Sequence, residues 1–360
     1  MRDRRGTVKR PHSTGRHHWV WLTKLAVSAA LLGYILWRVP LQSIGESLAG
    51  IQPVWLSLSL LATVPILWLM AWQMRILLSA VGPELSTPEI VRVNLVTEFY
   101  AFFLPSYVAG GALRWYLLGR EGSPAMATLA MLVYNRLVNI TVIAVSALLL
   151  WFADPPTRED GLIPWLLTGL LAILVLLHVV IFNRSLADRI RGLALRWARS
   201  GLLRQVSEKL SELAESAHLL GSLGWRTRVG VYGLCLVRQC IAIAAFYGFA
   251  VSLSLGISWV NVGFARAVAI LATLLPISFA GVGIREGGLI LALAGFDVPS
   301  GPAVALSLVM LLRDFLIRLS GGLLAAWRWV RGYQQPGKAP APTPLQRNNT
   351  SVPVDGEKRR

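Results

Sequence analysis

Apolar runs long enough to cross a lipid bilayer recur along the whole chain. A helix needs about 20 apolar residues to cross the hydrocarbon core, which is about 30 Å thick. Of the 360 residues, 55% are hydrophobic and only 15% are charged, and the mean hydropathy of +0.58 exceeds what soluble domains show. The runs therefore predict an all-α polytopic membrane protein whose helices form one integral domain.

The runs predict about six spanning helices and two interrupted ones. The spans lie near residues 19–38, 54–74, 124–152, 162–182, 229–255 and 302–329. The interrupted segments lie near residues 89–120 and 259–295. Because a proline and a group of small residues break each of them, we expect re-entrant segments that enter and leave the membrane on one side.

Polar segments complete the predicted organisation. Residues 1–18 form a basic N-terminal tail, the membrane domain covers residues 19–333, and residues 334–360 are predicted to be disordered. Within the domain, residues 183–228 carry apolar positions at helical spacing, which predicts amphipathic helices at the inner membrane surface or a solvated hairpin. The basic start followed by an apolar run resembles a signal peptide. We expect the first span to stay uncleaved, because Arg38 ends that apolar run.

The formal net charge of +17 is distributed as a topology signal. Lys and Arg gather before the first span, in the loop at 183–228 and after Arg328, whereas Asp154, Glu159 and Asp160 make another loop acidic. Since cytoplasmic loops carry the excess of Lys and Arg, we expect both termini in the cytoplasm of a multi-pass protein of the inner (plasma) membrane. No basic module with interleaved aromatic residues supports nucleic-acid binding.

The two interrupted segments share a sequence pattern. In both, Leu-Pro precedes Ala-Gly, and an arginine follows nine residues after the proline, Arg114 in the first and Arg285 in the second. A span with an intramembrane arginine comes next, with Arg136 and Arg313 respectively. The repetition predicts an inverted-topology repeat with the substrate site at the repeat interface, the first break opening from the cytoplasm and the second from outside. Chance similarity among common residues is the alternative.

The second break has the composition of an anion site. A proline ends one helix, Gly281 and Gly283 let the chain turn, and a short helix then runs from about residue 284 to 294. Its N-terminus concentrates unpaired N–H groups and a partial positive charge, to which Arg285 adds a full one. Glu286 serves either as a partner that neutralises Arg285 between transport events or as a titratable group for proton coupling.

Charged residues inside the predicted spans and breaks define a candidate site. Each costs roughly 2.5–3.5 kcal/mol at a helix centre, so several together are not expected to face lipid. The predicted substrate-binding set is Arg285, Glu286, Arg114, Gly281, Gly283, Arg136, Arg313 and Asp314. Further intramembrane charges are Glu98, Arg238 and Arg318. The alternative for Arg313 and Asp314 is that they only pair with charges on neighbouring helices.

No catalytic or metal-binding motif accompanies this set. The chain has no P-loop, nucleophile elbow or His-rich metal motif. Its cysteines, Cys235 and Cys240, lie too far apart around one helix to pair there. We therefore expect neither a cofactor nor a metal, and a transporter rather than an enzyme.

The two breaks carry a resemblance to a known family. The elements AGVGIREGG and LPSYVAGGALR, with the order of spans, resemble the flippase-like membrane domain of lysylphosphatidylglycerol synthases over about residues 20–330. The resemblance implies handling of an anionic phospholipid or a polyprenyl-phosphate-linked lipid. Because the chain ends in a short tail, we do not expect the soluble aminoacyltransferase domain of those synthases. Family members often carry an acidic residue before the first arginine, but Ala112 and Leu113 precede Arg114 here.

Two other classes of function fit the sequence. A membrane-embedded transferase acting on polyprenyl- or phospholipid-linked substrates would use Glu98, Glu286 or Asp314 as its base, although a metal-binding carboxylate pair is missing. The other is a non-catalytic partner of an envelope-synthesis enzyme. The leading hypothesis is a lipid transporter whose binding partners are membrane lipids with anionic headgroups.

Overall fold

A computed structural model describes residues 41–80, 82, 84–103, 107–155, 162–183, 223–274 and 283–330. Every regular element within these ranges is a helix, as the apolar runs predict. The helices are α2 (Leu41–Ala49), α3 (Pro53–Leu61), α4 (Thr63–Leu78), α5 (Thr87–Phe102), α6 (Tyr107–Arg120), α7 (Ala125–Ala153), α8 (Leu162–Phe182), α11 (Trp225–Ser252), α12 (Trp259–Ala272), α13 (Ile284–Ala294) and α14 (Ser300–Val330). The predicted span at 19–38, most of the loop at 183–228 and the tail at 334–360 lie outside the described residues.

The predicted spans that fall on described residues are helical. In the part of the chain that the structure describes, three helical stretches are long and apolar enough to cross a membrane: Pro53–Leu78 (α3 and α4 together), α7 and α11. The apolar part of α8 is shorter, and α14 is long but carries four charged residues, Arg313, Asp314, Arg318 and Arg328. α11 begins earlier than the predicted span at 229–255, because the helix includes charged residues such as Arg226 and Arg228 that give no apolar signal.

Both interrupted segments are broken near the two prolines, as predicted, but the first break is shorter than predicted, because Ala109, Gly110 and Gly111 lie within α6. In the first, α5 ends at Phe102 and α6 begins at Tyr107. In the second, α12 ends at Ala272 and α13 has the bounds predicted for the short helix. The two prolines and Gly281 lie in the gaps between these helices, outside the described residues.

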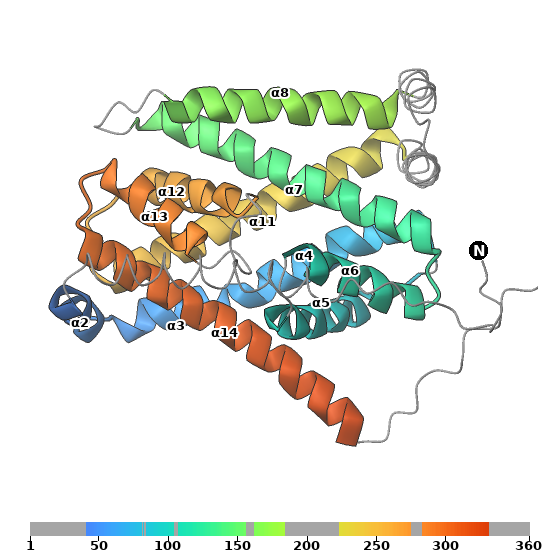
Figure 1. Cartoon of the computed structure of the whole chain (residues 1–360), viewed down its shortest axis with the longest axis horizontal. Helices are drawn as coiled ribbons and strands as arrows, with labels where there is room; N and C mark the ends of the chain where they lie inside the picture. The colour runs from blue at the N-terminus through green and yellow to red at the C-terminus, as the bar shows by residue number, and fades with distance from the viewer. Residues whose placement is uncertain are drawn as a thin grey trace, which may run out of the picture.

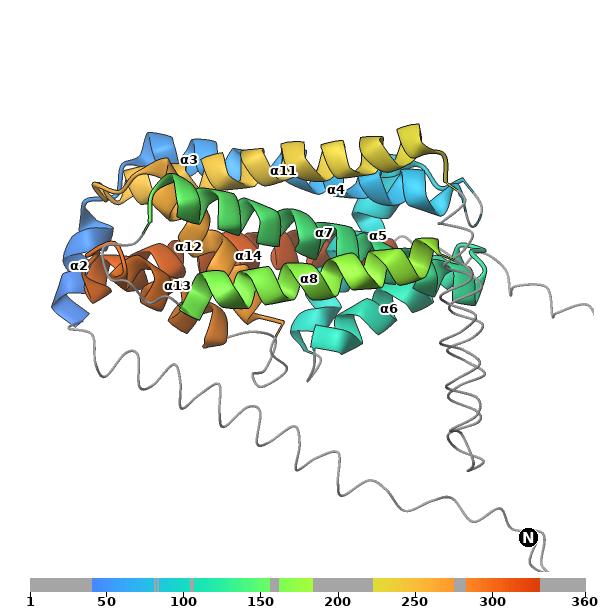
Figure 2. The same ribbon diagram turned by 90° about the horizontal axis from the view of Figure 1, so that it is seen from above.

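The two interrupted helix pairs occupy corresponding places in the bundle. α5 packs on α4, α6 and α14, while α12 packs on α11, α13 and α7. The span that follows each pair therefore packs on the interrupted helix of the other half: α14 on α5, and α7 on α12. Figures 1 and 2 show α5 and α6 toward one end of the long axis, and α12 and α13 toward the other.

Small residues allow the central helices to approach closely. Buried side chains fill two main clusters, one around Met74 and Tyr134 and the other around Phe246 and Leu306. Where α14 crosses α5, a Cβ added to Gly321 would lie 2.0 Å from the carbonyl oxygen of Leu95. This glycine therefore sets how close α14 comes to α5.

Candidate functional site

α13 begins with a turn that favours glycine. Gly283 has a φ of 88° and a ψ of −45°, a conformation in which L side chains are strained. Its N–H donates to Oε2 of Glu286 at 2.6 Å, and Glu286 is only 3% exposed. The carboxylate of Glu286 thus satisfies a backbone donor at the start of α13, where helices leave such groups unpaired.

Arg285 joins two carboxylates. Its Nη2 and Nε donate to Oε1 of Glu286 at 2.9 and 3.2 Å, and its Nη1 donates to Oδ2 of Asp314 on α14. Buried charges need such partners because their surroundings solvate them poorly. This arrangement balances the charge of Arg285 and corresponds to the neutralising role predicted for Glu286. Anion binding at the start of α13 stays a prediction.

Arg313 extends this cluster toward α4. Its Nη1 lies 3.5 Å from Oδ1 of Asp314, and its Nε donates to Oγ1 of Thr63, the first residue of α4, at 3.1 Å. The predicted site residues Arg285, Glu286, Arg313 and Asp314 therefore form one connected group, called the ion-pair cluster below. The pairing between neighbouring helices that the sequence left open for Asp314 is present. A direct contact of these residues with substrate stays a prediction.

The first interrupted segment holds a second ion pair. Nη2 of Arg114 on α6 lies 3.1 Å from Oε1 of Glu98 on α5. The acidic partner that is missing immediately before Arg114 in the sequence is thus supplied from the preceding helix. Glu98 is also close enough to Arg313 for their charges to interact, which brings this pair near the ion-pair cluster.

The remaining predicted residues are less closely connected to the cluster. Arg136 is half-buried on α7, which packs against α12, α8 and α6, and its role stays a prediction. Gly281 falls outside the described residues. Gly283 does reach the cluster, through its bond to Glu286.

Sequence reasoning missed Arg266. This residue lies on α12, and its Nη1 donates to Oε1 of Gln239 on α11 at 3.0 Å. Nearby on α11, Arg238 donates to Oδ1 of Asn139 on α7. The signal was available, because Arg266 is a charged residue within the apolar stretch VNVGFARAVAILA, the same criterion that identifies Arg285 and Arg313.

A large apolar cavity, open to the surface of the bundle, lies apart from these charges. Its volume is about 780 Å³, and it is bounded by α7 and α11, with walls that include Val145, Leu149 and Leu236. Trp225 and Arg228 line it at the start of α11. Ligand sites commonly have volumes of about 300–1,000 Å³ and mostly apolar walls. The cavity is therefore large enough for part of a lipid.

Comparison with known proteins places the chain in a family. A search of curated proteins finds no match. A family model described as the lysylphosphatidylglycerol synthase TM region matches residues 21–322, a range that includes both interrupted helix pairs. The match confirms the resemblance carried by the two broken segments. This chain belongs to the family of the lysylphosphatidylglycerol synthase TM region.

Proposed function

We propose that this protein is a membrane lipid transporter, and not an enzyme, that moves an anionic phospholipid or a polyprenyl-phosphate-linked lipid between leaflets. The observation that carries the proposal is the ion-pair cluster at the start of α13, inside an apolar helical bundle. Ionisable residues in such places mark the pathways of substrates or ions through membrane proteins. Membership of a family of membrane regions related to lysylphosphatidylglycerol synthase supports a role with lipids.

In this proposal the two interrupted segments are inverted, re-entrant copies that open on opposite sides of the membrane. Their reciprocal packing, α14 on α5 and α7 on α12, supports a two-fold relation between the halves. Their positions toward opposite ends of the bundle support opposite orientations (Figure 1). In transporters built this way the substrate binds at the interface of the repeats, where helices are discontinuous.

The cluster suggests how an anionic headgroup would be held. A phosphate offers Arg285 the same bidentate geometry as a carboxylate, so it can replace Asp314 or Glu286 as the partner of the guanidinium group. The displaced carboxylate keeps the site selective, because it competes with the headgroup and restores the ion pair after release. The apolar cavity between α7 and α11 supports accommodation of an acyl or prenyl chain.

Reconstituted vesicles test this function. Fluorescent phosphatidylglycerol in one leaflet is followed by quenching with a membrane-impermeant reductant, for the wild type and for Arg285→Lys. The lysine keeps a positive charge between the carboxylates but loses the planar fork. We expect translocation to fall by about tenfold, the equivalent of about 1.4 kcal/mol. The matched control is Arg75→Lys, because Arg75 is exposed on α4.

Two outcomes would count against the proposal. Lipid translocation in wild-type vesicles that does not exceed that in protein-free vesicles would contradict the transport function. Equal translocation by the wild type and by a correctly folded Arg285→Lys protein would contradict the role of the ion-pair cluster, while leaving transport itself standing.

A further inference from the structure

A small cavity lies between α4, α11, α12 and α14, beside the ion-pair cluster. Its volume is about 20 Å³, and its walls include Ile66, Phe246, Phe249, Met310, Arg266 and Arg313. About 10–15 Å³ measured in this way is enough to hold one water molecule. The cavity therefore has room for a small polar group among mostly apolar neighbours.

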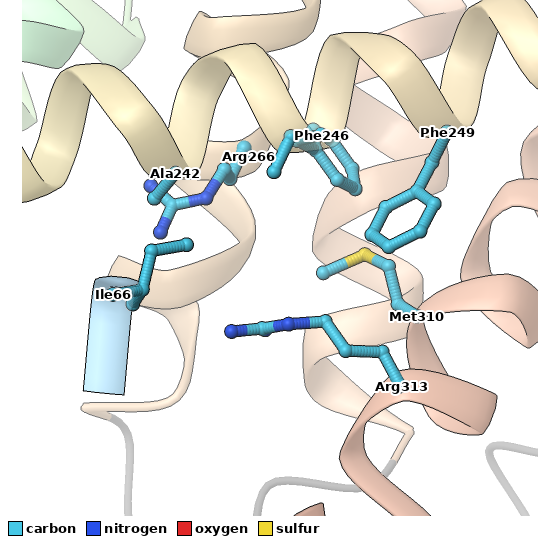
Figure 3. A pocket seen from close by; sticks show the side chains of 8 residues that line it. Ile66, Ala242, Phe246, Phe249, Arg266, Met310 and Arg313 are labelled. Carbon is cyan, nitrogen blue, oxygen red and sulfur yellow. The ribbon is translucent and has the colours of Figure 1, made fainter. Parts of the chain in front are cut away.

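Two guanidinium groups reach this cavity from different helices. Figure 3 shows the side chains of Arg266, from α12, and Arg313, from α14, extending toward the same side of the pocket, where Ile66 lies. None of the residues that line the cavity carries a carboxylate. Two like charges thus face one partly open space whose lining includes no negative side chain.

Among the described residues, Arg266 has no carboxylate partner, and the carboxylate that pairs with Arg313 is shared with Arg285. The hydrogen bond that Arg266 makes within this part of the chain goes to the neutral amide oxygen of Gln239. Arg313 shares Asp314 with Arg285, at the longer distance of 3.5 Å. The charges of Arg313 and Arg238 also act on Arg266. A buried cation surrounded by other cations is unfavourable unless an anion joins it.

We propose that this cavity is an anion-binding site, in which Arg266 and Arg313 together hold an anionic oxygen of a phosphate-type group. Both guanidinium groups offer several N–H donors in a planar fork, which suits a phosphate oxygen better than a single ammonium would. The apolar wall of Phe246, Phe249 and Met310 leaves room for little water, and so strengthens the attraction. The phosphate is either a free ion or the headgroup of a lipid. The site stands whether or not the protein moves lipid.

The test is anion-dependent thermal stability of the purified full-length protein. Unfolding is followed by tryptophan fluorescence in detergent, with sodium phosphate added at constant ionic strength, and separately in nanodiscs with phosphatidylglycerol or phosphatidylcholine. A ligand that binds only the folded state raises the melting temperature. We expect the anion to raise it for the wild type, and the apparent affinity to fall by about tenfold or more in Arg266→Gln.

Two further variants make the test decisive. Arg75→Gln removes an exposed arginine from α4 and should keep the full phosphate response, which controls for general salt effects. Arg266→Met replaces the guanidinium group with an apolar side chain and serves if the glutamine variant does not fold. Without any anion, Arg266→Met should melt at a higher temperature than the wild type, since it removes a buried charge that lacks a negative partner.

The outcomes distinguish a free phosphate ion from a lipid headgroup as the bound anion, and show whether the site binds an anion. A response to free phosphate assigns the site to an inorganic ion or a detached headgroup. A response to phosphatidylglycerol alone assigns it to the lipid. The proposal is overturned if neither raises the melting temperature of the wild type, or if Arg266→Gln and the wild type respond equally. Failure of lipid transport in vesicles would leave this result unchanged.

Discussion

The conformation of Gly283 determines how α13 begins. Its positive φ lets the chain turn so that its N–H meets the carboxylate of Glu286. That bond fixes one oxygen of Glu286 and leaves the other to accept from Arg285. The backbone at one glycine therefore orients the side chain that balances the charge of Arg285.

Substitution of Gly283 tests this dependence. Gly283→Ala should destabilise the protein by about 1–2 kcal/mol, because an L residue is strained at this φ. The control is Gly287→Ala, since Gly287 lies within α13 and an added Cβ there meets nothing within 4 Å. That change should be neutral or slightly stabilising. Thermal unfolding of both variants in detergent checks the expectation, and equal melting temperatures would contradict it.

At the scale of helices, the contact of α14 with α5 is one of those that join the two halves of the molecule. Arg313 and Asp314 stand on α14, and Glu98 stands on α5, so the spacing of these helices sets the distance between the ion-pair cluster and the pair formed by Glu98 and Arg114. Gly321 permits that spacing, because a side chain there would meet the backbone of Leu95.

Gly321→Ala should push α14 away from α5. The added Cβ would lie 2.0 Å from a backbone oxygen that cannot rotate away, and overpacking of this kind costs about 1–3 kcal/mol or more. Gly230→Ala on α11 is the control, because that position is open. We expect a lower melting temperature for the first variant only. An unchanged melting temperature for Gly321→Ala would show that the helices can part without cost.

Helices and their breaks were predictable from local sequence, whereas the partners of the charges were not. Apolar runs and a proline followed by small residues identify α7 and the start of α13 because these signals depend on the chain itself. The bond from Arg285 to Asp314, by contrast, joins two helices whose contact only packing determines. Glu98 as the partner of Arg114 arises in the same way. Arg266 shows a different limit of prediction from sequence. Its charge is evident in the sequence, but its position beside Arg313 is not.

At the scale of the whole molecule, we predict that the two ends of the bundle face opposite sides of the membrane. α7 ends at the acidic loop that begins with Asp154, and Oδ2 of this residue accepts a hydrogen bond from the Ser258 hydroxyl at 3.3 Å. The C-terminal end of α7 therefore lies beside the start of α12. α11 begins at the other end of the bundle, after the basic loop (Figures 1 and 2). From the positive-inside bias we predict that the first of these ends faces the outside and the second faces the cytoplasm.

Labelling of introduced cysteines tests this orientation. Pro155→Cys places a thiol at the acidic end, and Gly224→Cys places one at the basic end, where both native residues are exposed. A membrane-impermeant maleimide added to intact cells should label the first variant and reach the second only after permeabilisation. The parent protein supplies the background, because Cys235 and Cys240 both lie within α11. The reverse pattern would place the termini outside and reverse the side from which each interrupted pair opens. Labelling of both variants in intact cells would contradict a single fixed orientation, and with it the assignment of α5 and α6 to the cytoplasmic side.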